Sequence, residues 1–227
     1  MEINPTILIL CGGKGERLKP LTNKTHKSLT KIGKKSILQH LIDFFKKNKL
    51  QKFIFTTGYK SKQIEDYLKK KFQDLKYEVI NSGNADIIDR LKDVYKTKNE
   101  NTIICYGDTL ANINIKKYFK FLNKNKNKII LTIYRPEVKF GIVDLGKKNI
   151  VKSFREKPKL NIWINIGYIY MPKKMIKNIK KSNDFVRFLQ KEIKKKNVVF
   201  FKHSDLHITV NTLSELDEAK KNIKNFS

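Results

Sequence analysis

The stretch Leu10-Cys-Gly-Gly-Lys-Gly-Glu-Arg-Leu-Lys-Pro-Leu-Thr22 decides how this sequence is interpreted. It follows an apolar run, Thr6–Cys11, that has the length and the Ile/Leu content of a buried strand. Three glycines within four positions allow a backbone turn whose successive amide groups point at one ligand, and such turns bind phosphate. Lys14 and Arg17 add positive charge. The sequence therefore predicts a phosphate-binding loop, rather than a plain tight turn, after the first strand.

Two familiar phosphate-binding motifs do not fit this loop. A P-loop requires Gly-x-x-x-x-Gly-Lys-Ser/Thr, and no stretch of the chain has that spacing. A dinucleotide fingerprint that begins at Gly13 needs glycine or alanine at position 18, where this chain has Leu18. It also needs an acidic residue at the end of the following strand, and no nearby acid has that position. The loop belongs to another class.

Outward from the loop, strands and helices alternate through the first half of the chain. Further strands are expected at Lys52–Thr57, Tyr77–Asn81 and Thr102–Tyr106, and helices at Ser36–Asn48, Gln63–Phe72 and Asp86–Lys96. Ser36 and Gln39 have the spacing of a capping box at the start of the first of these helices. Such alternation predicts an α/β fold, a three-layer α/β/α sandwich around a Rossmann-like, mixed but mostly parallel sheet.

The second half has closely spaced strands with little helix between them. We expect strands at Ile129–Tyr134, Gly141–Leu145, Ile150–Phe154, Ile162–Tyr170, Val198–Lys202 and Ile208–Val210, and helices at Lys173–Lys180 and Asp184–Lys195. Thr212 and Glu215 form a second capping box that opens a helix through about Ile223. No internal repeat and no Pro- or Ser-rich linker interrupts the chain, so residues 1–227 are expected to form a single domain.

The composition is strongly basic, with 50 Lys and Arg residues against 21 Asp and Glu and a formal net charge of +29. Such a charge suggests nucleic-acid binding. However, 45 of the basic residues are lysine, whereas base recognition favours arginine. The lysines are scattered over all the expected helices, and no reader motif is present. The charge therefore indicates a lysine-rich coding bias, and we expect no nucleic-acid partner.

The cysteines, the first residues and the lengths of the apolar runs indicate in which compartment the protein is expected. Cys11 and Cys105 both lie in apolar runs, which favours two core thiols in a reducing compartment over a disulfide. The start Met1–Pro5 lacks a basic region and a long apolar stretch, so no signal peptide is expected. The longest apolar run, near Ile129–Tyr134, is too short to span a bilayer. We expect a cytoplasmic protein without membrane association.

Residues 12–22 resemble the signature loop of the sugar-nucleotide pyrophosphorylases, a family of nucleotidyltransferases with the pattern Gly-Gly-x-Gly-x-Arg-Leu-x-Pro-Leu-Thr. Every defined position is present. The family's Pro-Lys-Pro corresponds to His26-Lys27-Ser28, so the lysine is kept and both prolines are lost. Further family motifs follow in order at Tyr106-Gly-Asp108, Phe140-Gly141, Glu156-Lys-Pro158, Asn165-Ile-Gly167 and Val210-Asn-Thr212. The resemblance extends from about residue 6 to residue 225 and implies the nucleotide-diphospho-sugar transferase fold.

The resemblance also implies a reaction, in which an acceptor phosphate attacks the α-phosphorus of a nucleoside triphosphate and pyrophosphate leaves. Residues 1–125 would form the nucleotide-binding half and residues 126–227 the acceptor-binding half. The implied catalytic residues are Arg17 on the departing phosphates, Lys27 on the α-phosphate and Asp108 on Mg²⁺. The implied nucleotide-binding residues are Leu10, Gly12, Gly13, Lys14, Gly15, Glu16, Ser82, Gly83 and Arg90. The implied acceptor-binding residues are Tyr106, Gly141, Glu156, Lys157, Asn165 and Gly167.

One position departs from the family. A second aspartate usually stands before the last helix and helps to hold the metal, and the corresponding residue here is Asn211. An amide oxygen can coordinate Mg²⁺ but brings no charge. We therefore expect the metal on Asp108 and Asn211, with weaker affinity. His26 is expected to be a loop residue, because an anionic phosphate nucleophile needs no general base.

The middle of the chain resembles the cytidylyltransferase branch of the family. The stretch Asn81-Ser-Gly-Asn-Ala-Asp-Ile-Ile-Asp-Arg-Leu91 keeps Ser82, Gly83, Arg90 and Leu91 of the corresponding run in glucose-1-phosphate cytidylyltransferases, which implies CTP as the nucleotide. The overall pattern is similar to the cytidylyltransferases of capsular polysaccharide modification that convert L-glutamine phosphate to CDP-L-glutamine.

Several alternatives stay open for the acceptor and for the class of protein. A sugar 1-phosphate is one alternative acceptor. Phosphocholine is another, although it needs an aromatic cage and Trp163 is the only tryptophan. Two other classes of protein stay open: a catalytically weak, regulatory homologue of the nucleotidyltransferases, and a nucleic-acid-binding protein. The resemblance is compatible with either a monomer or a homodimer.

Overall fold

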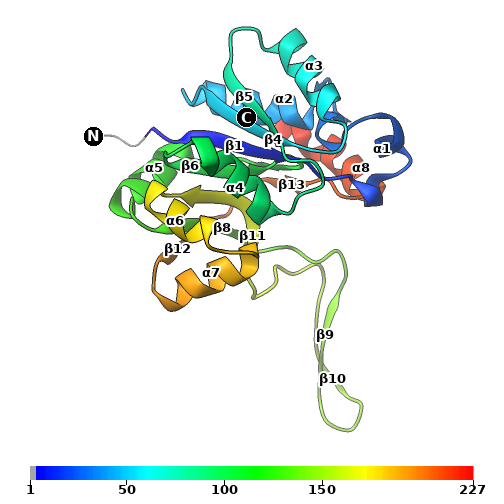
Figure 1. Cartoon of the computed structure of the whole chain (residues 1–227). Helices are drawn as coiled ribbons and strands as arrows, with labels where there is room; N and C mark the ends of the chain where they lie inside the picture. The colour runs from blue at the N-terminus through cyan, green and yellow to red at the C-terminus, as the bar shows by residue number, and fades with distance from the viewer. Residues whose placement is uncertain (1–3, 227) are drawn as a thin grey trace.

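The structure, a computed structural model, describes residues 4–226. Residues 1–3, which belong to the start considered above, and residue 227 lie outside the described part. The centre is a seven-stranded sheet in the order β12-β8-β11-β6-β1-β4-β5 (Figure 1). Its strands are β1 (Thr6–Cys11), β4 (Lys52–Thr57), β5 (Lys76–Asn81), β6 (Thr102–Tyr106), β8 (Ile129–Tyr134), β11 (Ile164–Met171) and β12 (Val198–His203).

One strand gives the sheet its mixed character. β11 pairs antiparallel with both β6 and β8, whereas all other neighbouring strands of this sheet pair in parallel. The carboxyl ends of β1, β6 and β8 therefore lie at the same edge as the start of β11. The predicted mixed but mostly parallel sheet is confirmed.

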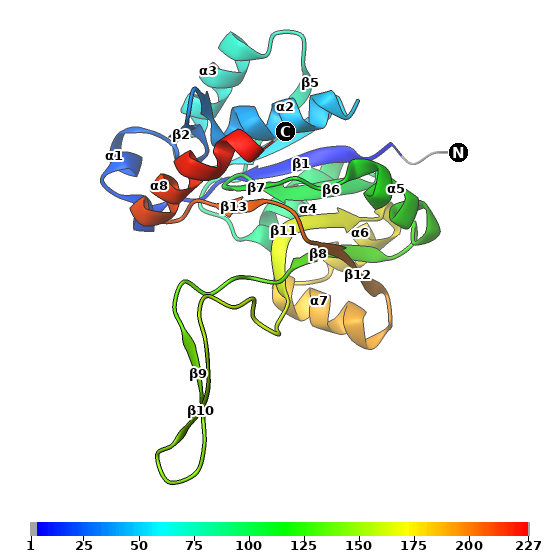
Figure 2. The same cartoon turned by 180° about the vertical axis from the view of Figure 1, so that it is seen from behind.

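Helices cover both faces of the sheet, which confirms the three-layer sandwich (Figures 1 and 2). One face packs against α2 (Ile37–Lys47), α3 (Ser61–Lys71), α5 (Ile115–Lys124) and α8 (Leu213–Asn222). The other face packs against α4 (Ile87–Thr97), α6 (Ile176–Lys180) and α7 (Phe185–Lys194). Within residues 4–226, every helix is too short or too polar to cross a membrane.

The apolar strands fill two separate cores. In β1, Ile7 and Ile9 face one core and Leu8 faces the other, and all three side chains are fully buried. This is why a strand in the middle of a parallel sheet has a continuous apolar sequence instead of an alternating one. Cys11 and Cys105 are free thiols in the interior, as expected, and burial raises the pKa of Cys11 to about 12.

Ser36 and Thr212 each begin a helix as predicted, but only the second of the two predicted capping boxes is complete. The Ser36 side chain accepts a hydrogen bond from the Gln39 amide at 3.1 Å and starts α2. The Thr212 and Glu215 side chains bond reciprocally to the backbone at the start of α8. These contacts satisfy amide groups that would otherwise have no partner in the first turn of a helix.

Several short elements were not expected. α5 begins at Asn114, whose side chain accepts a hydrogen bond from the Lys117 amide. The short strand β7 (Thr109–Ala111) was not expected, whereas β13 (His207–Thr209) corresponds to the strand expected at Ile208–Val210; the two form an antiparallel pair. The loop after β1 is followed by α1 (Leu21–Lys24), and a small pair, β2 (Lys31–Ile32) and β3 (Lys35–Ser36), precedes α2.

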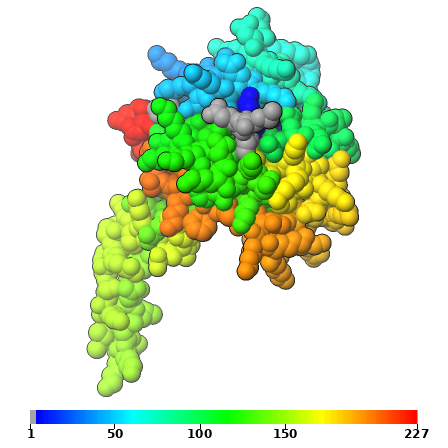
Figure 3. Space-filling view, turned by 90° about the vertical axis from the view of Figure 1, so that its left-hand side faces the viewer, coloured from blue at the N-terminus to red at the C-terminus, as the bar shows by residue number. Residues whose placement is uncertain are grey.

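A two-stranded hairpin projects from the body of the molecule (Figures 1 and 3). It consists of β9 (Ile142–Leu145) and β10 (Val151–Arg155), which pair antiparallel with each other and with no other strand. We call residues 140–156 the arm. Its base is held by hydrogen bonds between the segments 136–138 and 158–160. Because β8 and β11 are antiparallel neighbours, the arm leaves the sheet at the edge formed by the carboxyl ends of β1 and β6.

Candidate active site

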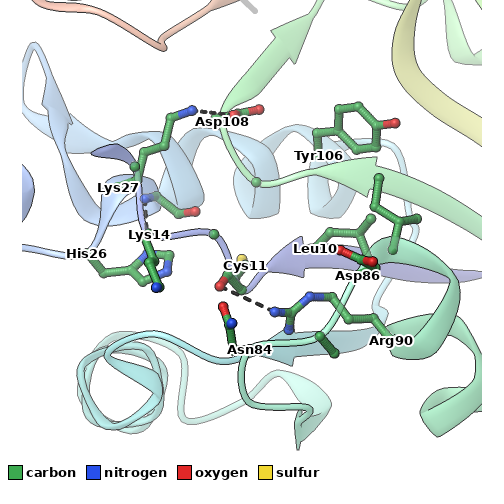
Figure 4. A pocket seen from close by; sticks show the side chains of 17 residues that line it. Leu10, Cys11, Lys14, His26, Lys27, Asn84, Asp86, Arg90, Tyr106 and Asp108 are labelled. Carbon is green, nitrogen blue, oxygen red and sulfur yellow. Dashed lines mark hydrogen bonds and ion pairs between the residues drawn. The ribbon is translucent and has the colours of Figure 1, made fainter. Parts of the chain in front are cut away.

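A pocket of about 330 Å³ lies where β1 and β6 end and α4 begins (Figure 4). It is lined by Leu10, Cys11, Gly12, Gly13, Lys14, Gly15, His26, Lys27, Ser28, Asn84, Ala85, Asp86, Ile87, Arg90, Tyr106, Gly107 and Asp108. Open α/β sheets bind ligands at this edge, outside the carboxyl ends of the strands. The pocket brings together most of the predicted nucleotide-binding residues with Lys27 and Asp108.

The glycine loop needs its glycines for reasons that the structure makes explicit. Gly15 has a φ of +67°, which favours glycine, and a Cβ there would lie 2.9 Å from the Thr22 side chain. The Thr22 hydroxyl donates to the Gly15 carbonyl at 3.0 Å and fixes the turn. A Cβ on Gly12 would lie 1.9 Å from the Arg90 guanidinium. The loop therefore tolerates no side chain at its two ends.

Arg90 on α4 holds three backbone segments together beneath the pocket. Its guanidinium donates to the carbonyls of Thr57 at 2.5 Å, Gly83 at 2.9 Å and Gly12 at 3.3 Å. The side chain is buried, and burial lowers its pKa. These bonds tie the glycine loop to the loop after β5, so the structure assigns Arg90 a positioning role. Its predicted contact with the nucleotide stays a prediction.

Lys27, Asp108 and Asn211 meet at the mouth of the pocket. The Lys27 ammonium lies 2.5 Å from Asp108 Oδ2 and 2.8 Å from Asn211 Oδ1 (Figure 4 shows the Lys27–Asp108 pair). The Thr109 hydroxyl donates a hydrogen bond to the other carboxylate oxygen of Asp108 at 3.0 Å. The backbone N–H of Asn211 donates to the Glu215 carboxylate. Residues more than 180 positions apart in the sequence thus surround a single charge.

These oxygens fit a hard divalent cation. Asp108 Oδ2 and Asn211 Oδ1 converge on one point, where the Lys27 ammonium stands in for a cation. Mg²⁺ is usually bound through one or two protein oxygens, with water and substrate phosphates completing its shell. Within residues 4–226, no three His, Cys, Asp or Glu side chains cluster closely enough to hold an ion by themselves. A metal here would therefore depend on the triphosphate.

Of the predicted acceptor residues, Tyr106 at the end of β6 lines the pocket, and Asn165 and Gly167 lie beside it on β11. Gly167 has a φ of +76°, and a Cβ there would lie 2.4 Å from the Tyr106 ring. The Gly167 amide donates to Asn165 Oδ1 at 3.2 Å. Burial, with the nearby Asp108 charge, raises the pKa of Tyr106, so its hydroxyl stays protonated at neutral pH. Tyr106 and Asn165 thus offer neutral hydrogen-bonding groups beside Asp108.

Other predicted site residues lie outside this pocket. Glu16 and Arg17 are exposed on the turn after the glycine loop, where Glu16 pairs with Lys19. Glu156 and Lys157 lie at the base of the arm, exposed and 4.0 Å apart. Gly141, on the arm, has a structural reason to be glycine, because a Cβ would lie 2.4 Å from the Phe154 ring. The predicted ligand contacts of these residues stay predictions.

Four polar residues that line the pocket, His26, Ser28, Asn84 and Asp86, were not among the predicted site residues. Asn84 and Asp86 lie in the loop before α4, within the stretch that resembles cytidylyltransferases, but only Ser82, Gly83 and Arg90 were singled out there. His26 is buried and accepts a hydrogen bond from the Ser28 amide at 3.1 Å. Burial lowers the pKa of His26 to about 4, so its ring is neutral at pH 7. A polar residue before a predicted helix start was the available signal for Asn84.

The sequence profile of the nucleotidyl transferase family matches residues 6–215. The chain belongs to this family. It is 29% identical over 199 residues to the D-glycero-alpha-D-manno-heptose 1-phosphate guanylyltransferase of Campylobacter jejuni, covering 83% of this chain and 86% of that protein. It is 29% identical over 177 residues to the glucose-1-phosphate cytidylyltransferase of Salmonella typhimurium, covering 67% of this chain and 68% of that protein.

Solved structures agree on the fold of this nucleotidyl transferase. HddC from Yersinia pseudotuberculosis superposes with a TM-score of 0.73 at 22% identity, over 96% of this chain and 99% of that one. An apo UDP-glucose pyrophosphorylase superposes with a TM-score of 0.77 at 13% identity, over 98% of this chain and 99% of that one. The predicted nucleotide-diphospho-sugar transferase fold is confirmed, and relatives of both guanylyl and cytidylyl specificity are present.

Proposed function

We propose that this chain is a Mg²⁺-dependent cytidylyltransferase that joins CTP to a small phosphorylated acceptor and releases pyrophosphate. The observation that carries the proposal is the meeting of Lys27, Asp108 and Asn211 beside a glycine loop. A cation, a carboxylate and backbone amides at one sheet edge are what transfer between two phosphate-bearing substrates requires. Catalysis of such a reaction consists mainly of positioning and charge neutralisation.

In the proposed reaction, an acceptor phosphate oxygen forms a bond to the α-phosphorus of CTP. The bond from the α-phosphorus to the bridging oxygen breaks, and that oxygen leaves with pyrophosphate. The glycine loop, Lys14 and Arg17 hold the β- and γ-phosphates, and Lys27 stabilises the charge that develops on the α-phosphate. Asp108 and Asn211 would hold Mg²⁺, which neutralises phosphate charge when bound. Lys27 must then exchange its present oxygen partners for the phosphate.

We assign recognition of cytosine to the loop before α4. Asn84 lines the pocket opposite Lys14 and His26 (Figure 4). Its amide offers both a donor and an acceptor, and the hydrogen-bonding edge of cytosine needs one of each. Arg90 holds this loop through the Gly83 carbonyl, so the amide of Asn84 projects from a fixed backbone. The resemblance of residues 81–91 to cytidylyltransferases supports CTP.

The acceptor that we propose is L-glutamine phosphate, which would yield CDP-L-glutamine for capsular polysaccharide modification. An amino acid presents an ammonium and a carboxylate as well as its phosphoryl group. Glu156 and Lys157 offer one charge of each sign at the base of the arm. The second candidate is a sugar 1-phosphate with GTP, because the heptose 1-phosphate guanylyltransferase aligns with 83% of this chain.

Pyrophosphate release separates these possibilities. The purified chain is offered CTP, GTP, UTP and dTTP, each with L-glutamine phosphate, glucose 1-phosphate, a heptose 1-phosphate or phosphocholine. We expect release with CTP and L-glutamine phosphate, and none after EDTA. Release with GTP and the heptose 1-phosphate would replace the proposal with the second candidate. Absence of release from every pair, with folded protein, would overturn the function altogether.

A further inference from the structure

The arm carries an apolar face that no part of residues 4–226 covers. In β9 and β10 the register sets Val143 opposite Phe154 and Leu145 opposite Val151, so these four side chains share one face. Leu145 is 83% exposed, Phe154 64%, Val151 57% and Val143 43%. Phe140, just before β9, is 76% exposed. An alternating strand pattern normally marks a face that packs against a core, and here no core is present.

The opposite face of the arm is polar and already satisfied. Asp144 accepts hydrogen bonds from the Ser153 hydroxyl and from the Arg155 guanidinium. The pairing holds the pKa of Asp144 below its ordinary value, first through the Ser153 hydrogen bond and then through the Arg155 charge. The two faces therefore differ sharply, as in a sheet that is covered on one side. A two-stranded ribbon without a packed face is only marginally stable in water.

We propose that a second copy of this chain covers the apolar face of the arm. Val143, Leu145, Val151 and Phe154 expose an apolar area of roughly several hundred Å² on one face of the arm, which is as much as a monomer usually leaves in its largest contiguous patch. In a dimer with twofold symmetry, each chain contributes this face to the contact, so the area of the face is buried twice. The buried area then reaches about 1,000 Å² or more, close to the lower bound for specific interfaces.

Charge around the arm supports a twofold antiparallel contact. The tip, residues 146–152, carries Lys147, Lys148 and Lys152 and no acidic residue. At the base, a depression lined by Glu137, Asp217 and Glu218 together with three lysines is neutral, in a chain of net charge +29. When two arms lie antiparallel, symmetry places each lysine-rich tip at the base of the other arm. Each tip would thereby meet the acids, and would lie beside Glu156 and Lys157 of the other copy.

A lipid surface fits the arm less well than a second copy does. The tip is the most basic part of the arm, because Lys147, Lys148 and Lys152 lie around the exposed Ile150 and Val151. An arm that entered a bilayer tip first would carry two or three lysines into hydrocarbon, which costs several kcal/mol. The proposal uses only exposure, register and charge, so it is independent of which nucleotide or acceptor the active site accepts.

The mass in solution tests the proposal directly. Sedimentation equilibrium of the full chain, over a hundredfold range of concentration, should give twice the 26.7 kDa of one chain. Leu145→Glu and Phe154→Glu should each weaken the dimer about 100-fold, because a charge would be buried in the contact. Val186→Glu is the matched control, since Val186 is an exposed apolar residue (59%) on α7. Circular dichroism and thermal melting confirm that each variant is folded.

Disulfide cross-linking tests the antiparallel arrangement. Both native thiols are buried, so a cross-link between chains can be attributed to the introduced cysteine. Val143→Cys, near the middle of the arm, should cross-link to its own copy in the partner. Chains with Lys148→Cys and Glu137→Cys should cross-link when mixed, whereas Lys148→Cys alone should not.

Three outcomes would overturn the proposal. The first is a monomeric mass at every concentration. The second is a dimer that Leu145→Glu and Phe154→Glu leave intact, because its contact then lies elsewhere. The third is a monomer that sediments with phosphatidylglycerol vesicles and loses this binding in Leu145→Glu, since the arm would then serve a membrane.

Discussion

The active-site pocket and the arm leave the same edge of the sheet but are built in opposite ways. At the pocket, the buried Arg90 is held by three backbone carbonyls, and Lys27 is held by Asp108 and Asn211. On the arm, apolar groups are exposed and only the polar face is satisfied. A fixed polar site needs no partner to keep its geometry, whereas an uncovered apolar face requires one. The pocket is therefore complete within one chain, whereas the arm is not.

The largest expected effect concerns the charges at the mouth of the pocket. Lys27→Ala and Asp108→Asn should each lower kcat about 10³-fold, because each removes charge stabilisation in the transition state. Circular dichroism should be unchanged, since both side chains lie at the pocket rather than in a core. Lys24→Ala, an exposed lysine on α1, is the matched control and should retain activity. A variant of Lys27 or Asp108 that turns over near the native rate would remove that residue from the mechanism.

The next effect tests whether Arg90 positions the two loops. Arg90→Lys should raise KM for the triphosphate about 30-fold with a smaller change in kcat, because an ammonium cannot replace a planar fork across three carbonyls. Gly12→Ala should have a similar effect, since its methyl group would displace the guanidinium. Arg187→Lys, at an exposed position of α7, is the control. A kcat loss with unchanged KM would instead indicate direct contact with reacting atoms.

Acid should destabilise the body of the molecule, which holds all four histidines, His26, His40, His203 and His207. Burial lowers the pKa of each one, to about 4 for His26 and His207. The unfolded chain binds these protons more readily, so stability is complete above about pH 6.5 and falls as pH drops toward 4. At pH 5, His26 and His207 should each lower the free energy of unfolding by on the order of 2 kcal/mol.

Urea denaturation at several pH values measures this loss, and NMR of the imidazole protons assigns it to particular rings. If the rings of the folded protein titrate near pH 6.5, or if the free energy of unfolding is flat from pH 7.5 to 5, the explanation is wrong.

The smallest effect concerns the base of the arm. Lys157→Ala should raise KM for the acceptor about 10-fold and leave KM for the triphosphate unchanged, because an exposed lysine contributes little more than a single screened charge. Lys159→Ala, an exposed lysine two residues further on, is the control. A change in KM for the triphosphate, without a change in KM for the acceptor, would indicate that Lys157 contacts the nucleotide instead.

Much of the fold could be predicted because its signals are local. Thr6–Cys11 is apolar throughout and is a central strand, and Ser36 and Thr212 have capping partners three residues away. α5 was missed because lysine and asparagine dominate its sequence, and of its side chains only Tyr118 and Leu122 are buried. A strand was predicted at Ile208–Val210, where β13 lies, but β7 and its pairing with β13 were missed, because β7 is three residues long and its partner lies about a hundred positions away.

The site was predicted less completely, because burial and direction are not visible in a sequence. Lys27 and Asp108 were identified, and the structure brings them together with Asn211. Arg90 was assigned to the nucleotide because residues 81–91 resemble those of cytidylyltransferases, yet its guanidinium faces backbone carbonyls. The strands of the arm were predicted to within one residue at each end. That one face has no partner within the chain could not be predicted, because alternation indicates two faces but not what covers them.

The reversed direction of β11 has a consequence for how this molecule can change. Because β8 and β11 are antiparallel neighbours, everything between Tyr134 and Ile164 is in topological terms an enlarged hairpin loop. Loops of this kind can be lengthened, shortened or exchanged at little cost to the strands that they join. Transplanting the connection of a relative into this chain would thus alter assembly and acceptor contacts together, while the register of the central strands and the nucleotide loops stay as they are. Assembly and acceptor binding would then both depend on one segment that can be exchanged as a unit.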